Sequence, residues 1–113
     1  MTADPSRDYT STRVVLLEES SAQEIRVNAS RGIPFCEKIV KGPPTFVGAY
    51  DDIVLLGSEL EQLRKCAPQV TRLPAADDHR NEFIYGTVVV VRTSEDGDVR
   101  DLTLEDYERL LER

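Results

Sequence analysis

Only three side chains in this 113-residue sequence are thiols or imidazoles: Cys36, Cys66 and His79. A catalytic thiol requires a neighbouring base, and nothing in the sequence brings His79 to either cysteine. Structural zinc sites pair their ligands at short spacing, as in C-x₂-C, and no such pair occurs here. We therefore predict no catalytic residue, no metal site and no cofactor, and expect both cysteines to be free thiols.

Carboxylates are abundant but lack the arrangement that acid–base catalysis or calcium binding requires. The aspartate pairs at 51–52 and 77–78 are adjacent in the sequence, and neighbouring side chains on a strand point to opposite faces. An EF-hand register set on Gly97 places Arg92 at the first ligand position and Thr103 at the last, so it fails. The glycines match neither a P-loop nor a dinucleotide fingerprint.

The charge balance favours a protein partner over nucleic acid or a membrane. The formal net charge is −7, whereas phosphate surfaces are bound by Lys and Arg. The last nineteen residues hold eight acids and three arginines. These residues form either a solvated helix face or an acidic surface that binds a basic protein. A special form of the second interpretation is a surface that mimics the charge of a nucleic acid. The candidate interaction residues are Glu95, Asp96, Asp98, Glu105, Glu108 and Glu112.

No apolar run approaches the roughly 20 residues that cross a membrane, and the N-terminus lacks the apolar core of a secretory signal. We therefore expect an intracellular protein. Residues 1–11 have too little apolar surface to offset the entropy of ordering, so we expect a flexible tail followed by a single domain over 12–113.

The candidate residues must be positioned by strands and short helices. Residues 12–19 and 24–28 predict a hairpin with a four-residue polar loop. Residues 45–50 predict a strand in which Gly48 marks a bulge or a close backbone approach, and the apolar run 53–57 predicts a buried strand. Four consecutive valines place the strand 83–92 in the middle of the sheet.

Two helices follow capping signals. Ser58 and Glu61 form a capping box before a helix over 59–66, with Leu60 and Leu63 on one face. Thr103 and Asp106 repeat the signal before a helix over 104–112. The apolar face of that second helix consists of Leu104, Tyr107, Leu110 and Leu111.

These elements predict an α+β domain with about five mostly antiparallel strands and two short helices, the C-terminal helix packing on the sheet. The segment 34–40 fits a helical turn or an edge strand, and its periodicity does not decide between them. The irregular segment 29–44 and the long polar loop 67–82 are the places where an unusual site would lie.

Three stretches, KGPPTFVGAYDDIVLL, YGTVVVVR and DGDVRDLTLEDY, resemble a family of small proteins from large DNA viruses that infect algae and protists. The resemblance covers about two thirds of the chain. It implies a stand-alone domain of viral or algal origin, and it carries over no catalytic residue, because the family has no assigned activity. The matching residues are Lys41, Gly42, Pro43, Phe46, Gly48, Tyr50, Gly86, Arg92, Asp101, Thr103, Leu104 and Tyr107.

Two functions follow from these patterns. The first is a small acidic, non-enzymatic interaction domain, acting in a virus particle or on a host factor in the cytoplasm or nucleus. The alternative is a small enzyme or ligand-binding protein with a site in the 29–44 and 67–82 segments, for which Cys36, Cys66 and His79 are the candidates. Self-association stays open at this point.

Overall fold

The valine run lies at the centre of the sheet, as predicted. The computed structural model describes residues 11–30, 35–66, 68–70 and 84–112. Within them, six antiparallel strands form one sheet in the order β2-β1-β5-β4-β3, with β6 pairing beside β5. In β5 (Val88–Thr93), Val88 and Val90 pack into one core cluster and Val89 and Val91 into the other. Both faces of β5 are therefore buried, which explains its lack of polar alternation.

The N-terminal hairpin turns more tightly than predicted. β1 (Thr12–Glu18) and β2 (Ser21–Val27) are joined by only two residues, because Glu18 pairs with Ser21 and Leu17 pairs with Ala22. The predicted four-residue loop is wrong. Ala22 packs against the core beneath the sheet, so extending the strand buries an apolar side chain that the loop would have left free.

The second hairpin follows the prediction. β3 (Pro44–Tyr50) pairs with β4 (Ile53–Ser58), and the register shifts between Phe46 and Gly48, which is the expected bulge. Asp51 occupies the turn with a φ of 59°, a conformation that Asp tolerates better than most residues. β4 lies between β3 and β5 and is almost entirely buried.

The predicted strand 83–92 begins too early. Gly86 has a φ of 80° and interrupts the extended chain, so that Tyr85 forms only an isolated bridge with Gln69. Val70, from the segment expected to be a polar loop, is buried and donates its N–H to the carbonyl of Ile84 at 2.8 Å. The rest of the 67–82 loop, residues 67 and 71–82, lies outside the described residues.

A short sixth strand was not predicted. In β6 (Val99–Arg100), Arg100 pairs with Arg92 across the Gly97 turn. The backbone N–H of Leu102 then donates to the carbonyl of Arg13 at 2.9 Å. The chain leaving β5 therefore runs beside the start of β1 before it enters the last helix.

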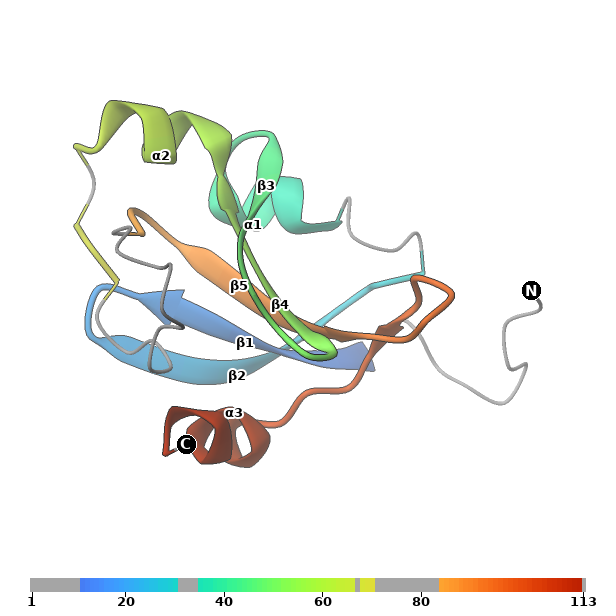
Figure 1. The fold of residues 1–113 in the computed structure, drawn as a ribbon. Helices are drawn as coiled ribbons and strands as arrows, with labels where there is room; N and C mark the ends of the chain where they lie inside the picture. Colours follow the sequence, from blue (N-terminus) through green and yellow to red (C-terminus); the bar gives the residue numbers. More distant parts are fainter. Residues whose placement is uncertain (1–10, 31–34, 67, 71–83, 113) are drawn as a thin grey trace.

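Helices cover both faces of the sheet (Figure 1). α1 (Cys36–Val40) packs on one face, so the undecided 34–40 segment is helical over 36–40, and the helix ends where Lys41 adopts a φ of 63°. α3 (Leu104–Leu111) packs on the opposite face. The α+β prediction with a C-terminal helix on the sheet is confirmed.

α2 (Glu59–Arg64) has the predicted cap but ends earlier than predicted. The Ser58 hydroxyl accepts from the N–H of Glu61 at 3.4 Å. The helix ends two residues early because Lys65 is left-handed, with a φ of 56°. Leu60 and Leu63, the two leucines expected on one face of this helix, are both exposed to solvent.

Candidate interaction surfaces

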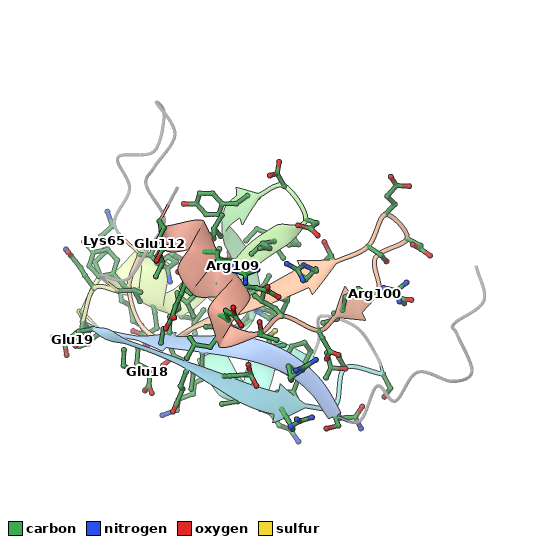
Figure 2. All side chains as sticks on the ribbon, turned by 90° about the horizontal axis from the view of Figure 1, so that it is seen from below. Glu18, Glu19, Lys65, Arg100, Arg109 and Glu112 are labelled. Carbon is green, nitrogen blue, oxygen red and sulfur yellow. The ribbon has the colours of Figure 1, made fainter. Side chains whose placement is uncertain are left out.

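α3 carries three of the predicted acidic residues on its outer side. Glu105, Glu108 and Glu112 are exposed and recur at helical spacing, and we call them the α3 acidic row. Arg109 lies among them, and its Nη2 atom is 2.7 Å from Glu105 Oε1. Figure 2 looks onto this helix and shows Arg109 and Glu112 at its surface. The row therefore presents three carboxylates and one cation.

The other three predicted acids lie in the turn between β5 and β6. Glu95 and Asp96 are exposed, whereas Asp98 is half-buried and its Oδ2 lies 3.9 Å from Arg100 Nη2. Ser94 orders the turn by donating its hydroxyl to Asp96 Oδ1 at 3.0 Å and accepting from the N–H of Asp98 at 3.2 Å. This turn projects from one end of the sheet, while α3 lies below the sheet (Figure 1). The predicted residues thus form two patches.

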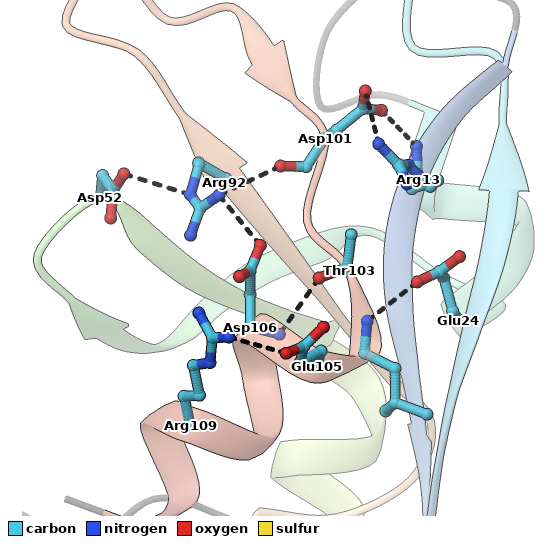
Figure 3. Close-up of polar contacts among 10 residues, drawn as sticks. Arg13, Glu24, Asp52, Arg92, Asp101, Thr103, Glu105, Asp106 and Arg109 are labelled. Atoms are coloured by element: carbon cyan, nitrogen blue, oxygen red, sulfur yellow. Dashed lines mark hydrogen bonds and ion pairs between the residues drawn. The ribbon is translucent and has the colours of Figure 1, made fainter.

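An ion network centred on Arg92 fixes the start of α3 (Figure 3). Arg92 Nη1 lies 3.3 Å from Asp106 Oδ2, and Nε lies 3.3 Å from Asp52 Oδ2 in the β3–β4 turn. Nη1 also lies 3.4 Å from the carbonyl oxygen of Asp101, to which it donates. One guanidinium therefore connects the central strand, a hairpin turn and the C-terminal helix. Sequence reasoning missed this network.

Two further contacts hold the same end of α3. Asp101 accepts from the backbone N–H of Arg13 at 2.8 Å, and its other oxygen lies 3.4 Å from the Arg13 guanidinium. The Glu24 carboxylate accepts from the N–H of Leu104 at 2.9 Å, at the helix N-terminus where negative charge is stabilised. Both strands of the N-terminal hairpin are thereby tied to the start of the helix.

The capping box at Thr103 is complete. Its hydroxyl accepts from the N–H of Asp106 at 3.1 Å. Burial raises the pKa of Asp106, but hydrogen bonds from the Thr103 side chain and backbone and the charge of Arg92 outweigh burial, so the pKa lies below the ordinary value of 3.8. Asp106 therefore stays ionised and holds the helix start to the sheet.

The residues of the alternative site do not form a described constellation. Cys36 is buried in α1, and desolvation raises the pKa of its thiol to about 12, which suppresses the thiolate needed of a nucleophile. Cys66 is exposed after α2, and its Sγ lies 3.3 Å from the Arg64 carbonyl oxygen, to which the thiol donates. His79 lies outside the described residues. Among the residues that the structure does describe, no group of three His, Cys, Asp or Glu side chains could hold a metal ion.

A groove of about 670 Å³ lies between the end of β2 and α1, within the segment singled out for an unusual site. Its apolar lining comes from Val27, Phe35 and Ile39, and its polar lining comes from Asn28, Ser30, Glu37 and Lys38. Asn28 is partly committed, because its Oδ1 accepts from both the N–H and the hydroxyl of Ser30. The groove is thus mainly apolar with a polar rim.

Residues 14–110 match a family of unknown function, DUF5880. The chain belongs to this family. The match runs from β1 into α3, so this DUF5880 domain comprises the sheet, the Arg92 network and the α3 acidic row up to Glu108. Membership assigns no activity, and no curated protein and no solved structure matches the chain. In the described part of the domain, no helix is long and apolar enough to cross a membrane.

Proposed function

We propose that this DUF5880 domain is a non-enzymatic interaction module that binds a basic protein through the α3 acidic row. The observation that carries the proposal is the fixed attachment of α3: its inner face buries Tyr107 and Leu110, and its first turn is held by Arg92 and Glu24. A helix so held presents its carboxylates in one orientation, so little backbone entropy is lost on binding.

The turn patch of Glu95 and Asp96 adds a second contact for a larger partner. Both patches act through exposed charges, which speed encounter and select partners more than they strengthen the final complex. A partner that is itself a nucleic-acid-binding protein would be blocked from its DNA, which is the charge-mimic form of the proposal. In that form the domain and DNA compete for the same basic surface.

The proposed setting is a virus particle or a host-cell factor in the cytoplasm or nucleus. What supports it is the resemblance of the stretches at 41–56, 85–92 and 96–107 to small proteins of large DNA viruses. The same residues have structural roles here: Gly48 forms the bulge, Arg92 forms the network and Thr103 caps α3. The resemblance therefore supports the setting and leaves the binding residues to experiment.

The test uses an arginine-rich peptide and a triple variant, Glu105→Gln, Glu108→Gln and Glu112→Gln. Exposed ion pairs contribute about 0.5 kcal/mol each, so losing three weakens binding roughly tenfold at low salt. The matched control removes three exposed carboxylates outside α2 and α3, with Glu18→Gln, Glu19→Gln and Glu37→Gln. Calorimetry at 50 and 300 mM salt compares the proteins.

We expect the control to keep the wild-type affinity and expect wild-type binding to weaken at high salt. Equal losses in the two triple variants would show that only net charge matters, and salt-insensitive binding would also contradict the proposal.

A second candidate is ligand binding in the groove beside α1. Its volume of about 670 Å³ lies within the range of roughly 300–1,000 Å³ typical of small-molecule sites. A fragment screen by NMR tests it: a ligand would shift the signals of Val27, Phe35 and Ile39, and replacing Ile39 by Glu would abolish those shifts. Shifts confined to other surfaces, or none, would reject this candidate.

A further inference from the structure

Large apolar side chains project into solvent on α2 and the neighbouring strand. The exposed fractions are 72% for Leu63, 64% for Phe46 and 41% for Leu60, and these are the exposed large hydrophobic residues in the described ranges. A six-residue helix at a protein surface would ordinarily turn its leucines inward. Here the arrangement is reversed.

Hydrogen bonds fix this reversed orientation. Gln62 Nε2 donates to the carbonyl of Tyr85 at 2.7 Å, and Gln62 Oε1 accepts from the N–H of Tyr85 at 3.0 Å. The same amide donates to the carbonyl of Ser58 at 3.2 Å. These hydrogen bonds hold Gln62 toward the backbone of Tyr85, and they thereby fix the rotation of α2 that exposes Leu60 and Leu63.

The exposed residues lie on the α1 side of the sheet. Phe46 is opposite Leu56, whose side chain belongs to the cluster under α1. Leu60 lies beside Gly42, which follows the end of α1: a Cβ placed on Gly42 would be 3.8 Å from Leu60 Cδ1. α3 covers the other face (Figure 1). We call Phe46, Leu60 and Leu63 the α2 apolar patch.

The charges beside this patch suit a second copy of the chain. Glu59 and Glu61 lie in the first turn of α2, Arg64 lies in the last, and Lys65 follows. An antiparallel copy of α2 would bring acidic and basic ends together twice. Residues 95–113 carry a net charge of −5, from eight acids and three arginines, so only −2 of the total of −7 falls on residues 1–94. Repulsion between copies is therefore smallest away from the α3 side.

We propose that the α2 apolar patch is a self-association surface on which two copies of the chain meet with their α2 helices antiparallel. Leu60 and Leu63 pack against the same residues of the partner, which is the isologous contact of a twofold dimer. The two α3 acidic rows stay uncovered, so the dimer would bind the proposed basic partner through two rows. The dimer itself does not depend on that function.

The surface is small, so we expect a dissociation constant on the order of 10–100 µM. Sedimentation velocity from about 1 to 500 µM tests this with Leu63→Asp, whose exposed site tolerates the change. This variant should weaken the dimer at least about tenfold. Gln23→Glu, which adds an acid at an exposed site on β2, is the matched control and should dimerise like wild type.

A charge exchange tests the antiparallel arrangement. Arg64→Glu makes both ends of α2 acidic and should weaken the dimer, whereas Glu61→Lys combined with Arg64→Glu should restore it. Circular dichroism and thermal melting check that each variant is folded. A wild-type protein that remains monomeric at 500 µM would overturn the proposal, as would a dimer unaffected by Leu63→Asp. Failure of the double exchange to restore association would overturn the antiparallel arrangement.

Discussion

Arg92 connects segments that are far apart in the sequence. Its side chain is 31% exposed and lies within 3.3 Å of carboxylates from both Asp52 and Asp106. Within the described residues, its Nε is the buried side-chain atom that has no hydrogen-bond partner, although the Asp52 charge lies beside it. Coulombic attraction from Asp52 offsets the missing hydrogen bond at Nε, while Asp106 holds Nη1 of the same guanidinium.

Acidification should weaken the Asp106 contact. Because the pKa of Asp106 lies below 3.8, its contribution to the free energy of unfolding is full above that pH and is lost as the pH falls through the lowered value. The wild type should therefore lose more stability than Asp106→Asn between about pH 4 and pH 2. Urea denaturation at several pH values measures this difference.

Glu108→Gln is the control for that experiment, because it removes an exposed carboxylate from the same helix. It should follow the wild-type acid profile. An Asp106→Asn profile parallel to wild type would show that the Arg92 contact contributes no pH dependence.

α2 and α3 begin alike but pack differently. Each starts at a hydroxyl cap three residues before an acid, and both caps form as the sequence predicts. α3 then buries Tyr107 and Leu110. In α2 the paired hydrogen bonds between Gln62 and Tyr85 turn the leucines outward. Capping is a local property, whereas the rotation of a short helix depends on what it meets.

This difference predicts unequal costs of truncation. Leu110→Ala should lower the free energy of unfolding by about 2–5 kcal/mol, because it leaves a cavity against the sheet. Leu63→Ala should change it by less than about 0.5 kcal/mol, because the side chain is exposed. Chemical denaturation at one pH and at a concentration below about 1 µM, where the proposed dimer dissociates, compares the two. Similar losses would mean that Leu63 contributes to the core.

Sequence patterns predicted the elements whose signals are local. The valine run, both caps and the Gly48 bulge are readable within a few residues. The first turn was mispredicted because Glu19-Ser20 lacks the Asn-Gly or Asp-Gly signal of a tight hairpin. β6 has only two residues and α1 only five, which is too short for a periodic pattern to reveal either element. The Arg92 network joins residues up to 54 positions apart, from Asp52 to Asp106. The periodicity of apolar residues in the sequence does not predict contacts at that separation.

At the scale of the whole molecule, the protection of backbone amides from hydrogen exchange should decrease from the middle of the sheet to its edges. β5 has strands on both sides and helices over both faces, whereas β2 and β3 are edge strands. Amides of β5 should therefore exchange only through global unfolding, and those of β2 and β3 through smaller openings. Hydrogen exchange followed by NMR measures this order. Equal protection in β2 and β5 would contradict the arrangement.

The strand order also has a consequence for synthesis on the ribosome. Both hairpins are translated before β5, yet β5 separates them by pairing with β1 on one side and β4 on the other. Until residue 93 has emerged, the nascent chain holds two apolar strand edges with no neighbour to pair with. Such edges readily join the wrong partner. β5 thus closes a gap that the two earlier hairpins leave open, and chaperones would be needed most during that interval.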